Sequence, residues 1–460
     1  MEIKPYQSIR KIHLTAPPCT LGITDGSERG DYAGSAHMLR RIGRPHQVVN
    51  LMFQYYPDVE HWPTQGVKWH GFYRNNSLNE GDGYFPLVLE EGGVWGRAYL
   101  KQIADVRAHG QDAQLTLTLH CDTPNEILVR IAKSLVPYGR MRLRINHECN
   151  GNWFYFNRRW SFKEVSDFFV RFHHILHEHA PEVWTVACWN GPGEAYEAPE
   201  KLEKHGKVTP DQLGPMFQIA DVISFDQYAS LHYLWPDPTF DPQRPTGSFS
   251  IPFEYWWKTL VDCHDLMCEL RGSEVNIEVH EVNQDSELFG VLGQAEWIKR
   301  FYREAVARRY PWLTNITFYM FRDRGGLGLE WEDADDPEKV EDRPALAAYA
   351  RAVQDTYFEY RVVESNEPIQ EPLAMKWSSS VESEGIQITC HASQDGESRI
   401  LLPREQHILA GCGGRWAIKR SGEEGVSLPL VQGENNVQLF MPPEDGKNNV
   451  PGAYEAEYQI

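Results

Sequence analysis

Two His-Glu pairs stand at the ends of apolar, β-rich runs of the sequence. The first pair, His147-Glu148, ends residues 141–148, and the second, His280-Glu281, ends residues 275–281. Two facing carboxylates can cleave an acetal, because one protonates the leaving oxygen while the other attacks the anomeric carbon or directs water at it. Glu148 and Glu281 are therefore candidate catalytic residues of a glycosidase.

Short β-rich runs alternate with helix-patterned segments from about residue 19 to residue 358. The clearest helix covers residues 161–180, where Ser161 and Glu164 form a capping box ahead of an apolar stripe. The expected strands are residues 20–24, 47–53, 114–120, 141–148, 183–189, 221–228, 275–281 and 315–321, and the last three are followed by helices at 253–270, 293–309 and 344–358. Eight such units predict a (β/α)8 barrel, an α/β fold whose catalytic side chains stand at the C-terminal ends of the strands.

The character of the chain changes after about residue 360. Residues 362–376 are acidic and interrupted by proline, and the strand runs that follow have no helices between them. These runs are residues 385–391, 399–402, 415–419, 436–440 and 454–460. Their turn-rich spacing predicts a β-sandwich. We therefore expect a catalytic barrel over residues 1–360 and a β-sandwich accessory domain over residues 361–460.

Composition and charge narrow the class of protein. The 460 residues include 65 acidic and 45 basic side chains, a formal net charge of −20, which repels a phosphate backbone and argues against a nucleic-acid partner. No apolar run is long enough to span a membrane and no signal peptide is seen, so we expect a cytoplasmic protein unless a leader was removed. The eight cysteines form no CxxC pair, and we expect catalysis without a metal or other cofactor. The expected partner is a carbohydrate substrate, and the oligomeric state is left open.

The segment that surrounds the first His-Glu pair carries a more specific signal. Its sequence, RINHECNGNWF at residues 144–154, resembles the strand-four motif of glycoside hydrolase family 26, R-x-x-H-E-x-N-G-x-W-F, and matches that pattern at every fixed position. The family contains mannanases and related β-glycanases of the retaining (β/α)8 clan. The resemblance implies that Glu148 is the general acid/base, that His147 touches the sugar beside it, and that Arg144 also binds substrate.

Other stretches are similar to the same family at lower specificity. Residues 221–228 resemble its sixth strand, and by that resemblance Tyr228 hydrogen-bonds the nucleophile Glu281. The end of the third strand places His120 within reach of the bound sugar, although a lone histidine at a strand end is as often structural. We also expect Trp153, Trp189 and Trp235 to offer platforms for sugar rings, because each follows or closes a strand on the catalytic side, whereas Trp184 should lie in the core.

The resemblance is incomplete around the proposed nucleophile. The family usually has a Glu followed by an aromatic residue and Gly, whereas this chain has Glu281-Val282-Asn283, which is closer to the Glu-x-Asn of family 39 glycosidases. The eighth strand also lacks the Trp that commonly lies beneath the sugar. Mannan specificity is thus weaker as an expectation than cleavage of β-glycosidic bonds by double displacement.

Two other classes of function remain open. A metal-dependent sugar isomerase or hydrolase would use His147, Glu148, His280 and Glu281 as ligands. A non-catalytic carbohydrate-binding relative would keep the barrel without the chemistry, although the presence of both glutamates argues against it. Loss of activity in chelator would favour the first class, and sugar binding without turnover would favour the second.

Overall fold

The computed structural model describes residues 3–26, 33–58, 84–87, 102–103, 105–106, 109, 111–138, 140–191, 206–233, 247–333, 336, 338–366, 373–375, 383–402, 404, 408–419, 422–440 and 452–454. These ranges contain every strand expected for the barrel and most of those expected after it.

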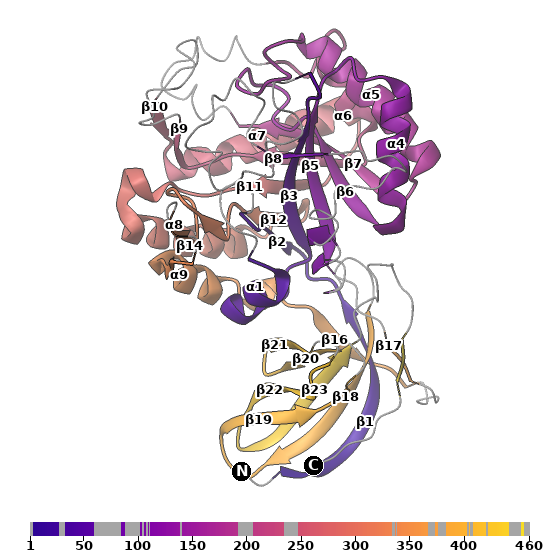
Figure 1. Cartoon of the computed structure of the whole chain (residues 1–460). Coiled ribbons are helices and arrows are strands. Elements are labelled where there is room, and N and C mark those ends of the chain that lie inside the picture. Colours follow the sequence, from indigo (N-terminus) through magenta and orange to yellow (C-terminus); the bar gives the residue numbers. More distant parts are fainter. Residues whose placement is uncertain are drawn as a thin grey trace.

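Eight parallel strands form a closed barrel (Figure 1). They are β2 (Thr20–Thr24), β3 (Val48–Tyr55), β5 (Asp112–Leu119), β6 (Met141–Ile145), β7 (Val183–Asn190), β8 (Val222–Asp226), β11 (Ile277–Glu281) and β12 (Leu313–Phe318). Each strand pairs with the next, and β12 pairs with β2, which closes the ring. A short strand, β4 (Phe85–Pro86), is added to β3. The (β/α)8 barrel expected from the sequence is confirmed.

The barrel strands separate polar and apolar side chains by alternation. On β5 the side chains of Leu115 and Leu117 belong to the main hydrophobic core. The alternate residues Gln114 and Thr116 donate hydrogen bonds to Asn50 of β3. Successive side chains of a strand point to opposite faces, so the leucines face the helices and the polar residues face the barrel interior. The interior of this barrel therefore carries a polar network that can hold charged groups.

Helices surround the barrel, as Figure 1 shows. They are α1 (Ser35–Ile42), α4 (Asn125–Leu135), α5 (Phe162–His179), α6 (Gly214–Ile219), α7 (Phe253–Arg271), α8 (Ser286–Arg308) and α9 (Pro344–Ala352), with 3-10 turns η3 (Val136–Tyr138) and η6 (Thr356–Phe358). The expected capping box is present, because Ser161 accepts a hydrogen bond from the Glu164 N–H and the Glu164 side chain accepts one from the Ser161 N–H. Helix α8 begins earlier than expected and is interrupted at Gly290, whose φ of 75° is left-handed. Among the described residues, no helix has both the length and the apolar character that crossing a lipid bilayer requires.

Short strands outside the barrel sheet form two small sheets in the barrel region. They are β9 (Ser230–Tyr233), β10 (Gly247–Ser250), β13 (Arg322–Asp323), β14 (Glu330–Glu332) and β15 (Val340–Asp342). β9 pairs with β10, and β14 pairs with both β13 and β15.

Antiparallel sheets follow the barrel and confirm the expected β-sandwich. The largest has the order β16-β1-β18-β23-β20-β21, and β19–β22 and β17–β24 form two-stranded sheets. The bounds are β1 (Ile3–Thr15), β16 (Arg361–Glu364), β17 (Leu373–Met375), β18 (Ser383–Ala392), β19 (Gly396–Leu401), β20 (Ile408–Cys412), β21 (Arg415–Lys419), β22 (Gly425–Leu430), β23 (Gly433–Phe440) and β24 (Gly452–Tyr454). This region has a core of its own, which includes Ile386, Leu428 and Leu439.

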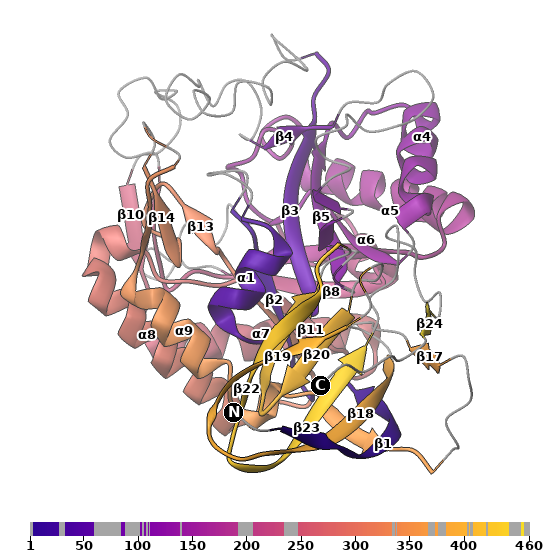
Figure 2. The ribbon, with the colours of Figure 1, turned by 60° about the horizontal axis from the view of Figure 1, so that its bottom comes forward.

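The first strand of the chain lies in the last sheet. β1 pairs along its length with β18 and, at its end, with β16. Its Ile12 and Leu14 pack with Leu409 and Phe440 of the sheet and with Leu39 of α1, so this cluster joins the sheet to the barrel region. Figure 2 shows α1 beside the C-terminal sheet. The division at residue 360 remains a prediction, and the pairing adds an observation that the division did not include: residues 3–15 share a sheet with the C-terminal strands.

Candidate active site

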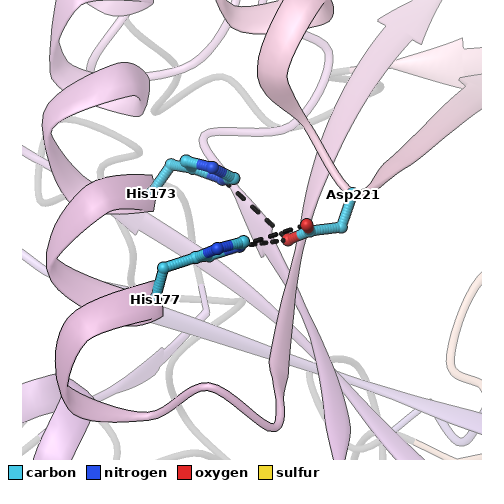
Figure 3. A group of neighbouring side chains, drawn as sticks. All are labelled: His173, His177 and Asp221. Carbon is cyan, nitrogen blue, oxygen red and sulfur yellow. Dashed lines mark hydrogen bonds and ion pairs between the residues drawn. The ribbon is translucent and has the colours of Figure 1, made fainter.

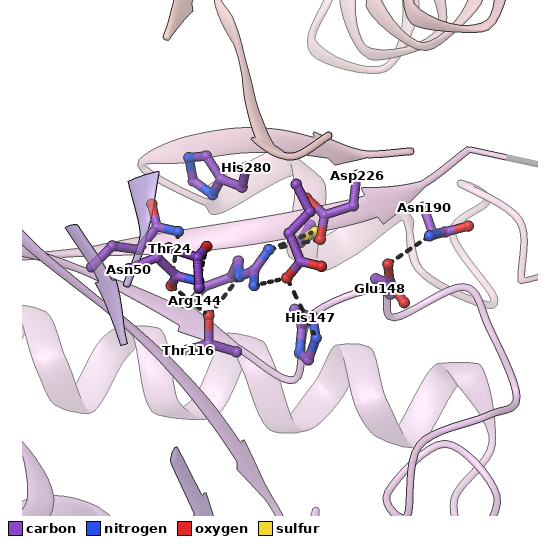
Figure 4. Close-up of polar contacts among 12 residues, drawn as sticks. Thr24, Asn50, Thr116, Arg144, His147, Glu148, Asn190, Asp226 and His280 are labelled. Carbon is purple, nitrogen blue, oxygen red and sulfur yellow. Dashed lines mark hydrogen bonds and ion pairs between the residues drawn. The ribbon is translucent and has the colours of Figure 1, made fainter. Parts of the chain in front are cut away.

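Three carboxylates meet at the C-terminal ends of β6, β8 and β11. One oxygen from each of Glu148, Asp226 and Glu281 lies within 4.8 Å of one from each of the others. All three side chains are buried in the part of the molecule that is described. The structure therefore brings together the two glutamates that the sequence singled out and adds a third acidic residue, Asp226 (Figure 4).

Left-handed backbone at the end of β6 positions the first His-Glu pair. Asn146 has a φ of 45° and Glu148 a φ of 49°, a region that non-glycine residues rarely adopt. The Asn146 side chain fixes the turn, because its Oδ1 accepts a hydrogen bond from the Leu119 N–H at 2.7 Å and its Nδ2 donates to the Leu119 oxygen at 3.2 Å. This break in the alternation of the strand lets both His147 and Glu148 reach the site. Strain of this kind is typical of functional residues.

A bulge at the end of β11 positions the second glutamate. Val279 pairs with Phe225 of β8 and Glu281 pairs with Asp226, so His280 is an extra residue between them. In a regular strand His280 and Glu281 would face opposite sides, but an extra residue re-aims the side chain that follows it. Glu281 therefore enters the same group as Asp226, while His280 contacts Glu278 at 2.8 Å within the barrel.

Arg144 of β6 lies between two of the carboxylates. Its Nη1 donates to Asp226 at 2.6 Å, and its Nη2 donates to Glu281. The side chain is fully buried, and its contacts position these two carboxylates. The expected contact of Arg144 with a bound sugar stays a prediction. Sequence reasoning could not distinguish these roles, because the partners are 82 and 137 residues away along the chain.

A hydrogen-bonded chain holds Arg144 from the other side of the barrel. Its Nε donates to Thr116 of β5 at 2.8 Å, Thr116 donates to Asn50 of β3 at 2.9 Å, and Asn50 donates to Thr24 of β2 at 3.2 Å. Figure 4 shows this chain running from the strands of the first half of the barrel to the guanidinium. With β8 and β11 it links six of the eight barrel strands to the position of one positive charge.

The charges in this group are shared unequally. Burial acts to lower the pKa of Arg144, but the charges of Asp226 and Glu281 outweigh it and raise that pKa well above its usual value. Burial raises the pKa of Asp226 to about 7, although Arg144 acts to lower it. One guanidinium therefore contacts two of the three carboxylates, and the group can hold a proton at neutral pH.

Glu148 occupies a position that favours its protonated form. Burial is the main cause that raises its pKa well above the usual value, and the negative charges of Glu281 and Asp226 add to it. Its two oxygens accept hydrogen bonds of 2.6 Å, one from Trp153 Nε1 and one from Asn190 Nδ2, which act in the opposite direction. A carboxyl that is protonated near neutral pH and held by two donors has the properties of a general acid.

Glu281 has contacts that stabilise a negative charge. Besides the ion pair with Arg144, its Oε2 accepts a hydrogen bond of 2.6 Å from the hydroxyl of Tyr228. Burial raises the pKa of Tyr228 well above its usual value, so this hydroxyl keeps its proton and donates. The contact expected between Tyr228 and Glu281 is present in the structure.

His147 lies against the same carboxylate but carries no charge. Its Nε2 is 4.0 Å from Glu281 Oε1 and 3.2 Å from the hydroxyl of Tyr84. Its ring packs on Phe154 with centroids 4.3 Å apart. Burial, helped by the nearby Arg144, lowers its pKa well below the usual value, so the imidazole is neutral. Its expected contact with a sugar stays a prediction.

His120, at the end of β5, belongs to a neighbouring aromatic group. Its Nε2 is 3.0 Å from Asp58 Oδ1. Its ring lies 4.8 Å from that of Tyr56 and 5.2 Å from that of Trp160, measured between centroids. These contacts explain the histidine structurally, and its expected reach to a bound sugar remains untested.

The expected tryptophan platforms have different fates. Trp153 is half-buried and contacts Glu148, as described above. Trp189 packs against Phe217 of α6, with ring centroids 5.9 Å apart, while Asn190 next to it contacts Glu148. The expected role of Trp189 as a platform stays a prediction. Trp235 lies outside the described residues. Trp184 was expected in the core but is 41% exposed.

Two residues of the site had no role in the sequence analysis. Asn190 follows Trp189 on β7, and only the direction in which the strand faces separates the two. Asp226 ends β8 in the same way that Glu281 ends β11, and this was the signal that could have identified it. Asn283, the residue that departs from the family 26 pattern, donates to the carbonyl oxygens of Tyr319 and Leu327 and so fixes the loop after β11 to the end of β12.

The ligand set proposed for a metal-dependent enzyme does not converge. His280 is fully buried and contacts Glu278 instead of His147 or Glu148. The described residues that could ligate an ion at this place are the three carboxylates, and the guanidinium of Arg144 already supplies a positive charge to two of them. The side chains present therefore do not fit the four-ligand metal site that was expected as an alternative.

Comparisons with known proteins find similarity at the level of the fold. No protein-family model matches the sequence, and no curated protein matches it either. A family 39 glycoside hydrolase from Bacteroides cellulosilyticus has 12% identity and a TM-score of 0.45, over 93% of this chain and 81% of that one. A monomeric β-xylosidase from Caulobacter crescentus has 11% identity and a TM-score of 0.46, over 94% and 98%.

The catalytic domain of a family 26 endo-β-1,4-mannanase from Bacillus sp. JAMB-750 is also similar. It has 13% identity and a TM-score of 0.43, over 74% of this chain and 86% of that one. Values this low say nothing about chemistry, so these structures are not used to assign roles to the side chains.

Proposed function

We propose that the protein is a retaining glycoside hydrolase that cleaves β-glycosidic bonds of a poly- or oligosaccharide, with Glu148 as general acid/base and Glu281 as nucleophile. The observation that carries the proposal is the short separation of two carboxylates in unequal surroundings. Oxygens of Glu148 and Glu281 lie within 4.8 Å of each other. Retaining enzymes hold their carboxyl groups about 5 to 5.5 Å apart, whereas inverting ones leave about 6.5 to 9.5 Å for a water molecule.

The reaction takes two steps. In the first, an oxygen of Glu281 forms a bond to the anomeric carbon, the bond from that carbon to the leaving oxygen breaks, and Glu148 gives its proton to the leaving oxygen. In the second, Glu148 takes a proton from water, and the water oxygen displaces Glu281 from the same carbon. Two inversions at one carbon return the original configuration.

The surroundings of each carboxylate suit its part. Glu148 must hold a proton at neutral pH, and burial together with two nearby carboxylates raises its pKa in that direction. Glu281 must be negatively charged, and Arg144 and Tyr228 both stabilise that charge. The complete strand-four motif at residues 144–154 supports the same assignment by resemblance.

The test begins with a panel of polysaccharides and oligosaccharides, in which reducing-end release identifies a substrate. The same panel is run with the Glu281→Gln variant, because turnover that survives this change does not arise at the proposed site. The anomer formed first is then followed by NMR. We expect retention, whereas inversion would overturn the double displacement, and sugar binding without turnover over the whole panel would overturn the enzyme assignment.

A further inference from the structure

A second group of ligand-forming side chains lies at the other end of the strands that carry the candidate active site. It consists of His173 and His177 of α5 and Asp221, the residue directly before β8. One ligand atom from each lies within 4.8 Å of the others. Asp226 ends the same strand at the active site, roughly 16 Å away along an extended strand. The two groups are therefore separate.

The spacing of the histidines places them on one face of α5. Residues four apart are neighbours on a helix surface, and the two rings have centroids 4.0 Å apart. Figure 3 shows both rings directed at the Asp221 carboxylate. His177 Nε2 is 3.1 and 3.0 Å from its two oxygens, and His173 Nδ1 is 3.9 Å from Oδ2. Ligands of one tetrahedral ion, each about 2.0 to 2.2 Å from it, stand roughly 3.3 to 3.6 Å apart, which is close to these separations.

Thr185 of β7 holds this group from behind. Its backbone N–H and its hydroxyl contact Asp221 Oδ2 at 2.7 and 2.8 Å. The same hydroxyl lies 2.8 Å from His173 Nδ1 and, because it donates to Asp221, accepts a hydrogen bond from that nitrogen. The two contacts to Asp221 are of the kind that orient a metal ligand, whereas His173 must move its proton from Nδ1 to Nε2 to bind an ion through Nδ1. With Oδ2 held by Thr185, Asp221 Oδ1 faces His177. An ion pair at the surface does not require these additional contacts to Thr185.

The exposure of His177 also suits an ion. The His177 side chain is 47% exposed, which leaves a route from solvent. Arg271, the nearby cation, donates to the carbonyl oxygens of Phe217 and Ala220.

We propose that His173, His177 and Asp221 bind Zn²⁺ and thereby tie α5 to the segment that enters β8. Two imidazoles and one carboxylate with an open fourth position form a ligand set typical of zinc, and imidazole disfavours Mg²⁺ and Ca²⁺. When the ion binds, the direct contact between His177 and Asp221 is replaced by bonds from both side chains to the ion. The sequence analysis did not indicate a metal at these three residues, because Asp221 is far from the histidines along the chain.

A third group must be separated from this one in any experiment. His264 and Cys268 are also four residues apart, on α7, and lie near Glu274. The side chain of Glu274 is 71% exposed, whereas that of Asp221 is 22% exposed and is held by Thr185. Asp221 is therefore held in place more firmly than Glu274, so the group on α5 is better positioned to bind an ion. A Cys268→Ala variant removes one ligand of the group on α7.

The experiment measures thermal unfolding of the full chain, stripped of metal with chelator, with and without ZnCl2. The wild type should gain at least about 3 °C at zinc concentrations far above Kd, and MgCl2 should have no effect. His177→Ala should abolish the gain. The matched control is His174→Ala, which removes an exposed histidine next to the group, and it should keep the gain, as should Cys268→Ala. Calorimetric titration should give one zinc ion that is lost only with His177.

Three results would overturn the proposal. They are the absence of any zinc effect in the wild type, an undiminished effect in His177→Ala, and loss of the effect in Cys268→Ala instead. All variants should unfold at nearly the same temperature without zinc, because an exposed pair contributes little. Glycosidase turnover by His177→Ala should equal that of the wild type, so this test and that of the proposed function can fail independently.

Discussion

The two His-Glu pairs of this chain have the same residue types, but their backbone conformations and their side-chain contacts differ. Glu148 is reached through left-handed backbone and lies against the neutral donors Trp153 and Asn190. Glu281 is reached through a bulge and contacts the cation Arg144 and the hydroxyl of Tyr228. The two carboxyls therefore differ because of the side chains that contact them, since the His-Glu dipeptide is the same in both.

The two histidines make the same point. His147 lies beside Glu281 in the site, whereas His280 points into the barrel and contacts Glu278. Burial lowers the pKa of His280 to about 4. The pKa of Glu278 falls to about 2, because Arg142 and His280 outweigh the effect of burial. The second histidine is therefore a neutral partner of the buried ion pair between Glu278 and Arg142.

The largest expected effect comes from removing the proposed nucleophile. Glu281→Ala or Glu281→Gln should lower kcat/KM by at least about 10⁴-fold on every substrate, because no covalent intermediate can form. An activated aryl glycoside should not restore the rate, because its good leaving group removes the need for a proton but not the need for a nucleophile. Added azide should give at most a product of inverted configuration. Rescue by azide with retention would reverse the two assignments.

Removal of the acid should give a smaller and more selective loss. Glu148→Ala should lower the rate on natural glycans by about 10² to 10⁴-fold, because their leaving oxygen must be protonated. On an activated aryl glycoside this variant should still form the glycosyl-enzyme and turn over slowly. Azide should then speed release with retained configuration. Wild-type activity of Glu148→Ala on natural glycans would contradict the role.

Much of the fold could be predicted because its signals are local. Each barrel strand is a short apolar run with turn residues beside it, and α5 begins at a capping box that the sequence displays. The position of each glutamate at an element end follows from the same runs. The first strand was missed, because β1 is stabilised by pairing with strands that come more than 340 residues later.

The facing of side chains at the strand ends could not be predicted. Alternation would place His280 and Glu281 on opposite sides, and only the extra residue in the pairing with β8 brings Glu281 into the site. Asn190 was missed for a related reason, because the direction in which β7 faces, and not the residue type, brings its side chain to Glu148. The burial of Arg144 depends on partners from distant strands, which no local pattern reveals.

The contact that distinguishes Glu281 can be tested by a single atom. Tyr228→Phe removes the hydroxyl that donates to Glu281 and should lower kcat/KM by about 10 to 100-fold, the range expected for a hydrogen bond to a charged group. The matched control is Tyr138→Phe in η3, which is in the main core and should change the rate little. An unchanged rate in Tyr228→Phe would remove the proposed role of this tyrosine.

The smallest effect concerns the donors that distinguish Glu148, and it appears in the pH profile. The hydrogen bond from Asn190 lowers the pKa of Glu148 by favouring its charged form. Asn190→Ala should therefore raise that pKa further, and since the acid must be protonated to act, the alkaline limb of kcat/KM should move to higher pH. The rate at the optimum should fall by less than about 10-fold, because a hydrogen bond to a neutral carboxyl is worth about 1 kcal/mol. Asn152→Ala removes an exposed asparagine from the same loop as Trp153 and should leave the limb in place. A shift of the limb to lower pH in Asn190→Ala would contradict this effect. It would show that Asn190 supports the protonated form of Glu148.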